Sequence, residues 1–187
     1  MIKAVDLRKG KTIMYEGELA IVHEIHHVAK GNKRSYMQAK IKSFKTGTMF
    51  EARFNVDDRV ETPFVETKEY EFLYRDGQDF IFMDLESYDQ FPVNGDLVGD
   101  SSTWMTPNLR VSCSLYNGQI IQIDVPFTVT LTVTDCPPVV KGSTATNQLK
   151  DAVLETGAKV RVPAFIEPGE RVNVDTRTGE YIERAKS

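Results

Sequence analysis

A short polar loop, residues 29–35 with the sequence AKGNKRS, holds the residue types best suited to binding chemistry in this chain. Three of its seven residues are cationic and none is acidic. It also contains Gly31 and Asn32, residue types that a tight turn uses where φ is positive. Cations on an exposed turn can contact phosphates, although an isolated loop of this kind is more often a solvated hairpin turn.

The seven residues after this loop alternate between apolar and polar side chains. A strand points successive side chains to opposite faces, so residues 36–42 predict one apolar and one polar face. The apolar face holds Met37, Ala39 and Ile41. The polar face holds Tyr36, Gln38, Lys40 and Lys42. We expect a hairpin with a positive tip and a basic outer face, whose candidate phosphate contacts are Lys30, Lys33, Arg34, Lys40 and Lys42.

The net charge of −4 is distributed unevenly along the chain. Residues 1–62 hold 12 Lys/Arg and 8 Asp/Glu, residues 63–126 hold 3 and 11, and residues 127–187 hold 8 of each. Electrostatic attraction is local, because the Debye length is only ~8 Å at physiological salt. A basic end can therefore bind phosphates while an acidic middle keeps the protein soluble.

Two pairs of carboxylates, Asp57 with Asp58 and Asp96 with Asp100, are candidates for acid–base chemistry. Such chemistry needs pKa values that are driven apart by the surroundings. Each pair lies in a polar or glycine-rich turn without an accompanying His, Lys or metal-ligand pattern. We interpret all four as solvated turn residues.

The three histidines, His23, His26 and His27, do not match a metal site. Neighbouring strand residues point to opposite faces, and His23 and His27 would lie ~13 Å apart at ~3.3 Å per residue. When protonated, His26 and His27 could instead add to the charge of the hairpin. The chain also lacks the glycine and serine patterns of phosphate-binding and hydrolase motifs. The sequence therefore predicts no enzyme activity, no metal and no cofactor.

Nearly every periodic segment has period two, which predicts strands. Residues 127–134 alternate strictly between apolar residues and Thr, and residues 79–85 and 119–123 are rich in apolar, β-branched or aromatic residues. Turn signals recur between them, including the hairpin-favouring pairs Asp76-Gly77, Asn94-Gly95 and Asn117-Gly118. Short strands at this spacing are typical of all-β sandwiches or small barrels.

Helical signals are weak. Residues 87–91 could form one turn closed by Pro92, and residues 146–156 could hold a short helix that stops near Gly157. Neither segment is long enough to organise the fold.

Two prolines, Pro63 and Pro126, mark candidate boundaries and divide the chain into residues 1–62, 63–126 and 127–187. The first part, with its basic hairpin, suits an SH3-like (KOW-like) barrel. The other two have the length of five-stranded OB-type barrels. Parts of about sixty residues are small for independent stability, so we expect neighbouring parts to pack on one another.

The chain has no apolar run of the ~20 residues that span a bilayer. Its first nine residues contain no apolar signal core. Cys113 and Cys136 are too few for a disulfide framework. We expect a cytoplasmic protein with free thiols and no membrane association.

Several motifs resemble the elongation factor P family. Residues 154–166 (LETGAKVRVPAFI) are similar to its carboxy-terminal signature, and residues 169–184 (GERVNVDTRTGEYIER) continue the match. Shorter matches resemble its second domain at residues 74–77, 82–84 and 88–90, and its first domain at residues 7–10 and 46–48. The resemblance covers essentially the whole chain.

The resemblance implies an all-β, L-shaped factor in which an SH3-like barrel is followed by two OB-fold barrels. Such proteins are non-catalytic monomers that bind both ribosomal subunits beside the peptidyl-tRNA. They stimulate slow peptide-bond formation, notably between consecutive prolines. Their first-domain hairpin reaches towards the peptidyl-transferase centre, which implies tRNA or ribosomal RNA contacts from Lys30, Gly31, Asn32, Lys33, Arg34, Lys40 and Lys42.

Counted back from Gly47 without gaps, the resemblance aligns Asn32 with a family Lys or Arg that is extended after translation. Tyr36 then takes the place of a family Phe. A one-residue shift brings Lys33 to the tip, where it would be modified by a lysine-modifying enzyme or act unmodified. In the third domain, the resemblance implies small-subunit or messenger contacts from the loop Gly142, Ser143 and Thr144, which usually reads Gly-Asp-Thr.

Two other functions stay open. One is an OB-fold module for free RNA or single-stranded DNA, and the other is a divergent elongation factor P-like paralogue with a restricted set of targets. A module of the first kind needs aromatic stacking platforms on a basic face. Here the aromatics gather instead in the acidic middle part, at Phe64, Tyr70, Phe72, Tyr74, Phe80 and Phe82.

Overall fold

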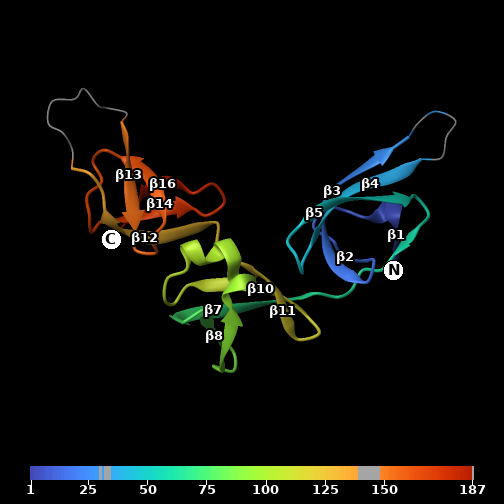
Figure 1. Cartoon of the computed structure of the whole chain (residues 1–187), viewed down its shortest axis with the longest axis horizontal. Coiled ribbons are helices and arrows are strands. Elements are labelled where there is room, and N and C mark those ends of the chain that lie inside the picture. Colours follow the sequence, from blue (N-terminus) through green and yellow to red (C-terminus); the bar gives the residue numbers. More distant parts are fainter. Residues whose placement is uncertain (30, 32–34, 139–147, 187) are drawn as a thin grey trace. The chain divides into compact units, whose positions relative to one another are not determined.

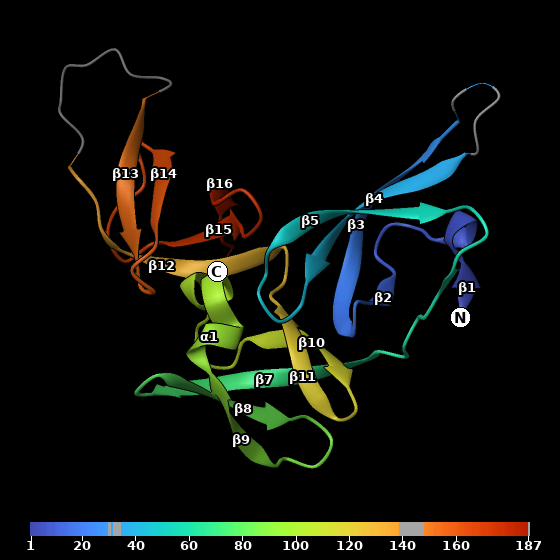
Figure 2. The same ribbon diagram turned by 45° about the vertical axis from the view of Figure 1, so that its right-hand side comes forward.

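The computed structural model describes residues 1–29, 31, 35–138 and 148–186, and strands account for most of it (Figures 1 and 2). The all-β prediction is confirmed. The chain forms two compact units, residues 1–67 with 114–122 and residues 68–113 with 123–187. The predicted boundaries at residues 62/63 and 126/127 stay a prediction.

The first sheet carries the predicted hairpin. Its strands, in spatial order, are β2 (Thr12–Tyr15), β3 (Glu18–Val28), β4 (Tyr36–Ser43) and β5 (Met49–Asn55). β3 and β4 run side by side as the longest antiparallel pair of this sheet (Figures 1 and 2). Nearby, β1 (Ile2–Lys3) pairs with β6 (Arg59–Val60), and η1 (Ala4–Asp6), a 3₁₀ turn, follows β1.

Strand β4 shows the alternation that the sequence predicts. Met37, Ala39 and Ile41 are at most 4% exposed, whereas Lys40 and Lys42 are exposed. The buried side chains pack with Leu7, Ile13 and Val22 in the core of this unit. Burial of that face fixes which face of β4 is presented outward, because a one-residue slip would exchange the two faces.

A one-residue bulge interrupts β3 at His23. Val22 pairs with Ile41 and Glu24 pairs with Lys40, so His23 has no partner of its own. Beyond the bulge the faces are reassigned, as a bulge requires. Glu24 and His26 now lie opposite Lys40 and Gln38 on the outer face. A strictly alternating strand does not give this arrangement.

The second sheet holds the aromatic residues of the middle part. Its strands, in spatial order, are β11 (Gln119–Asp124), β10 (Arg110–Tyr116), β7 (Glu66–Asp76), β8 (Asp79–Asp84) and β9 (Gln90–Asn94). Its buried aromatic side chains are Tyr70, Phe72, Phe80 and Phe82, each at most 6% exposed. Phe72 packs against Phe80 and Phe82 in tilted contacts, and Tyr70 packs edge-on against Phe91. The four buried rings therefore build the core and do not form a stacking platform.

Two expectations about residues 87–96 are wrong. Residues 87–91 form no helical turn, because Gln90 and Phe91 begin β9. Pro92 lies within this strand, which is tolerated because β9 is at the sheet edge and an edge residue can do without its N–H. Asn94-Gly95 starts a helix and not a hairpin.

That helix is α1 (Gly95–Val98), which continues into the 3₁₀ helix η2 (Gly99–Trp104). Asn94 is its N-cap, and its side-chain Oδ1 accepts a hydrogen bond of 2.8 Å from the Asp96 N–H. An Asn followed by an acidic residue in the first turn is a recognised start signal. The residue pattern was interpreted as a hairpin turn, whereas the hydrogen bond from the Asp96 N–H shows that Asn94 caps a helix.

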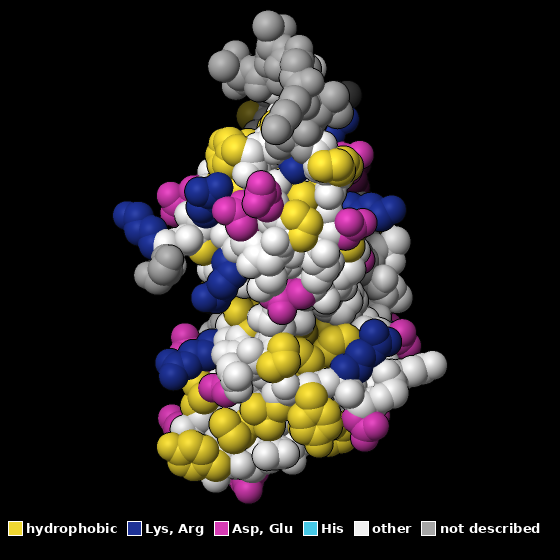
Figure 3. Space-filling view, turned by 90° about the vertical axis from the view of Figure 1, so that its left-hand side faces the viewer, with side chains coloured by type: hydrophobic (Ala, Val, Ile, Leu, Met, Phe, Trp, Pro, Cys, Tyr) yellow, Lys and Arg dark blue, Asp and Glu magenta, His cyan; other side chains and the backbone are white. Residues whose placement is uncertain are grey.

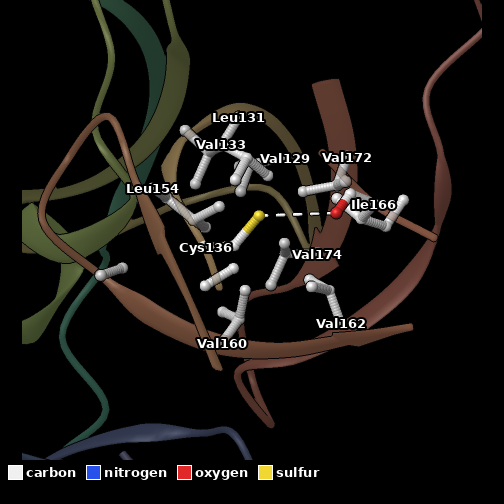
Figure 4. Packing of buried hydrophobic residues seen from close by; sticks show 12 residues of the cluster. Val129, Leu131, Val133, Cys136, Leu154, Val160, Val162, Ile166, Val172 and Val174 are labelled. Atoms are coloured by element: carbon white, nitrogen blue, oxygen red, sulfur yellow. Dashed lines mark hydrogen bonds between the residues drawn. The ribbon is translucent and has the colours of Figure 1, made fainter. Parts of the chain in front are cut away.

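The third sheet contains β14 (Lys159–Pro163), β13 (Leu149–Leu154), β12 (Thr128–Asp135), β15 (Arg171–Asp175) and β16 (Glu180–Arg184), in that order. In β12 the apolar residues Val129, Leu131 and Val133 are at most 4% exposed while the Thr residues face outward. Figure 4 shows these side chains packed around Cys136, whose thiol donates to the Ile166 carbonyl at 3.4 Å.

The expected helix in residues 146–156 is wrong. Residues 149–154 form β13, which pairs antiparallel with β14 over residues 149–153. Ala152 and Leu154 are each 1% exposed and pack into the third core. Ala, Leu and Glu favour a helix intrinsically, but pairing with β14 and burial in the core outweigh that weak preference.

Candidate nucleic-acid interface

The outer face of β3, β4 and β5 is the surface from which the predicted hairpin contacts would be made. β4 places Tyr36, Gln38, Lys40 and Lys42 along this face, with Tyr36 nearest the loop. Neighbouring strands add Glu24 and His26 from β3, and Glu51 and Arg53 from β5. The surface is therefore built from three strands, although the sequence pattern showed one.

Lys40 is not a free cation. Its ammonium lies 3.3 Å from a Glu24 carboxylate oxygen, and both side chains are nearly half exposed. The hydrogen bond and charge of Lys40 lower the pKa of Glu24 below its ordinary value, and the charges of His23 and His26 act in the same direction. Glu51 lies across from Lys40 on β5. The predicted basic face is thus partly neutralised at its centre.

Lys42 lies on the same face and forms no ion pair with the described residues. Its cross-strand partners are Ile21 and Met49. Gln38, one step nearer the loop, donates to Glu51 at 3.3 Å. Lys42 thus has more freedom than Lys40 to contact an external anion.

Arg53 is a cation of this face that the sequence reasoning missed. Its guanidinium carbon lies 3.6 Å from the centre of the Tyr36 ring. The signal was present, since Ala52 and Phe54 are apolar and alternation places Arg53 on the opposite face. What the sequence could not give is the pairing of β5 with β4, which brings Arg53 to Tyr36.

Most of the predicted contact residues in the two loops lie outside the described residues. Lys30, Asn32, Lys33 and Arg34 are not among them, and neither are Gly142, Ser143 and Thr144 of the other candidate loop. Gly31 is described and has φ of +46°, the left-handed region that favours glycine. The expectation of a turn with positive φ is met at this residue.

The carboxylates set aside as turn residues have structural partners. Asp57 accepts a hydrogen bond of 3.1 Å from Lys3, and Asp58 accepts one of 2.7 Å from the Asn55 N–H. Asp96 lies in α1 and Asp100 in η2. Among residues 1–29, 31, 35–138 and 148–186, no three His, Cys, Asp or Glu side chains gather as metal ligands would.

Both cysteines are free, as predicted, and the structure shows that both are buried. Burial, reinforced by the charge of Asp124, raises the pKa of the Cys113 thiol to about 12. In the part of the chain that the structure describes, no helix has the length and apolar character to cross a membrane.

The rest of the surface mixes charges of both signs. Figure 3 shows Lys and Arg side chains interspersed with Asp and Glu on one face of the molecule, with hydrophobic side chains gathered in the lower half of the view. Three of the exposed cations are paired or engaged, Lys45 with Glu18, Arg177 with Asp175 and Arg184 with Glu170.

Comparisons with known proteins place these features in a family. Three family models match, the elongation factor P KOW-like domain at residues 3–60, the elongation factor P OB domain at residues 65–123 and the elongation factor P C-terminal model at residues 129–184. Elongation factor P of Gemmatimonas aurantiaca is 41% identical over 183 residues, covering 98% of this chain and 97% of that protein. The Acidobacterium capsulatum protein of the same name is 41% identical over 184 residues, covering 98% and 99%.

A solved structure has a fold similar to that of this chain. Eukaryotic translation initiation factor 5A from Methanococcus jannaschii superposes with a TM-score of 0.53 at 14% identity, covering 67% of this chain and 90% of that one. At such low identity the likeness shows the fold alone. The predicted architecture, an SH3-like barrel followed by OB-fold barrels, is confirmed. With its three matched domains and close relatives over nearly its full length, the chain belongs to the elongation factor P family.

Proposed function

We propose that this protein is a translation elongation factor that binds the ribosome beside the peptidyl-tRNA and relieves stalling at consecutive prolines. The observation that carries the proposal is its match to proteins named elongation factor P at about 40% identity over 98% of the chain. The likeness spans all three matched domains, so each domain of such a factor has a counterpart here.

The first sheet supplies the proposed contact to tRNA or ribosomal RNA. Lys30, Lys33 and Arg34 lie between β3 and β4 in the sequence, and Lys42 is exposed on β4. Contacts of this type hold the phosphate backbone and position the protein without reading base sequence. Lys40 contributes less than the sequence suggests, because Glu24 already neutralises it.

The proposed mechanism is positioning and not chemistry by the protein itself. Ordering the acceptor end of the peptidyl-tRNA lowers the entropic part of the barrier, and such effects can supply ~7–11 kcal/mol in the best cases. Proline is a constrained nucleophile that reacts slowly. A contribution of only ~1.4 kcal/mol would accelerate the step about tenfold.

Reconstituted translation tests the proposal. A message with three consecutive Pro codons is translated with and without the protein, and full-length product is followed over time. We expect the protein to relieve the stall and to leave a matched message without Pro codons unaffected. Equal stalling with and without the protein would refute the proposed function.

Modification of the loop is a second part of the proposal. Lys33 is the candidate for extension by a lysine-modifying enzyme, because the aligned tip position holds Asn32. Intact-protein mass spectrometry of material from the native host tests it. A mass above that of the unmodified chain, localised to Lys33 by fragmentation, is expected, whereas the unmodified mass would contradict it.

The remaining finer proposals follow from the same resemblance. The protein would act as a cytoplasmic monomer, divided into the parts 1–62, 63–126 and 127–187. The loop Gly142, Ser143 and Thr144 would contact the small subunit or the messenger. The OB-fold module for free oligonucleotides is disfavoured, because four of the six aromatic residues considered for a stacking platform are core residues, namely Tyr70, Phe72, Phe80 and Phe82. Ribosome profiling of a deletion strain would separate the general factor from a paralogue with few targets.

A further inference from the structure

We propose that Arg53, whose guanidinium carbon lies over the Tyr36 ring at the start of β4, binds the phosphodiester backbone of the tRNA. Neither residue was a sequence candidate for an RNA contact. The inference rests on the proposed function and adds a binding residue to it. It places a phosphate contact on β5, next to the strand that the sequence pattern singled out.

The geometry of the pair is set by the β4–β5 ladder. Tyr36 pairs with Asn55, and Gln38 pairs with Arg53, so Tyr36 and Arg53 are diagonal neighbours on one face. Diagonal neighbours lie within reach of aromatic and long side chains. The guanidinium carbon is 3.6 Å from the ring centre, which is stacking distance. Both residues belong to well-paired strands, so the sheet holds the contact in place.

Stacking leaves the hydrogen-bonding edge of the guanidinium available. The flat face of an arginine is used by the ring, whereas its five N–H donors point outward in the plane. A planar fork of donors matches two phosphate oxygens. Within the described part of the chain, Arg53 forms no ion pair and donates to no oxygen of the protein.

Comparison with the other stacked arginines shows that this freedom is unusual. The described residues contain three more arginines above aromatic rings, at 4.5 to 5.3 Å. Each gives donors to an oxygen of this chain: Arg75 to the Gly77 carbonyl at 2.9 Å, Arg177 to Asp175 at 2.7 Å and Arg184 to Glu170 at 3.0 Å. Arg53 has the shortest distance to its ring of the four, and no described oxygen of the chain accepts a hydrogen bond from it.

The position of the pair matches its proposed role. Tyr36 is the first residue of β4, one residue after Ser35 at the end of the basic loop. Further from the loop, Gln38 is bonded to Glu51 and Lys40 to Glu24. A nucleic-acid backbone that contacts the loop would therefore meet Arg53 before it meets the acidic side chains.

The test measures affinity for ribosomes that carry peptidyl-tRNA in the P site, with full-length protein labelled at its N-terminus and titrated at several salt concentrations. For Arg53→Ala we expect about tenfold weaker binding at low salt. The slope of log affinity against log salt should fall by about 1, because one phosphate contact is lost. Arg53→Lys keeps the charge but loses the planar set of N–H donors, so its affinity should lie between those of wild type and Arg53→Ala.

Tyr36→Leu tests whether the ring acts through Arg53. The single variant should bind more weakly than wild type, and Tyr36→Leu combined with Arg53→Ala should be no weaker than Arg53→Ala alone. Arg59→Ala is the charge control, because Arg59 is an exposed cation of the same unit on β6. It should bind like wild type. If the contact between Tyr36 and Arg53 served only to stabilise the fold, the variants would have a lower midpoint of thermal unfolding. The salt dependence of their ribosome binding would then equal that of wild type.

The outcomes separate this inference from the proposed function. If wild-type protein relieves proline stalling but Arg53→Ala binds within twofold of it with the same salt slope, the Arg53 inference is wrong and the function stands. If wild-type protein relieves no stalling, the function itself fails. An equal loss on ribosomes with an empty P site would assign the contact to ribosomal RNA and overturn the tRNA assignment.

Discussion

At the scale of single residues, the candidate interface is decided by which neighbour each charge meets. Lys40 and Lys42 look equivalent in the sequence, yet Glu24 pairs with the first and no described carboxylate pairs with the second. Arg53 has an aromatic platform and free donors. Individual exposed ion pairs contribute little stability, so their main effect here is on which cations remain available to phosphate.

Removing the carboxylate of Glu24 should strengthen RNA binding. Glu24→Gln frees Lys40 and removes a negative charge that repels phosphates, so we expect affinity for ribosomes to rise about two- to threefold at low salt and the gain to shrink as salt screens it. Asp57→Asn removes a carboxylate from the same unit, away from this face, and serves as control. Unchanged or weaker binding of Glu24→Gln at low salt would contradict the prediction.

Asp175 and Arg177 give a direct test of local electrostatics. The hydrogen bonds and charge of Arg177 lower the pKa of Asp175 to about 2, from an ordinary value near 3.8. A carboxylate with a lowered pKa stabilises the fold above its unfolded-state pKa, and this contribution is lost as pH falls through about 4 to 2. In Arg177→Ala the Asp175 pKa, measured by NMR titration, should move back towards 3.8. No upward movement would refute the assignment.

At the scale of elements, alternation is a reliable guide wherever one face of a strand is buried. β4 and β12 follow their predicted faces because a slip of one residue would expose the core. The sequence pattern mispredicted two elements. For β13 it predicted a helix, because the segment contains residues with helical preference, and for α1 it predicted a hairpin turn, because Asn-Gly pairs are common in hairpins. In both cases pairing or capping outweighed the local pattern.

Substitutions on the two faces of β12 should change the free energy of unfolding by different amounts. Leu131 is fully buried in the third core, so Leu131→Ala should lower the free energy of unfolding by ~2–5 kcal/mol through lost burial and a cavity. Thr128 is exposed on the same strand, and Thr128→Ala should change the free energy of unfolding by no more than ~0.5 kcal/mol. Denaturant unfolding of both variants measures the difference. Similar changes in the free energy of unfolding at the two positions would contradict the burial of Leu131 and the exposure of Thr128.

At the scale of the whole molecule, a barrel of about sixty residues gains only marginal stability from its own core, so contacts with a neighbouring sheet matter. Within the unit of residues 68–113 and 123–187, Trp104 and Leu109 from the middle part pack against the core of the third sheet. Trp104 also lies 3.9 Å from where a Cβ on Gly179 would be. One tryptophan thus joins two sheets into a single unit.

Loss of this side chain should weaken the coupling between the two sheets. We expect Trp104→Ala to lower stability by about 1–3 kcal/mol, because a large and partly buried apolar surface is lost. Calorimetry should then resolve separate transitions for the middle and third sheets. Leu97→Ala, an exposed apolar residue of α1, serves as control. A single unshifted transition in Trp104→Ala would contradict the coupling.

The sequence by itself determined the all-β class, the faces of β4 and β12, the free cysteines and the family. These follow from alternation, turn residues and motifs, which act between residues close in the chain. Tertiary structure decided the pairings that make the interface, namely Glu24 with Lys40 and Tyr36 with Arg53. The physical reason is that strand register and the bulge at His23 place these side chains together, and a single strand's pattern contains no information about its partner's register.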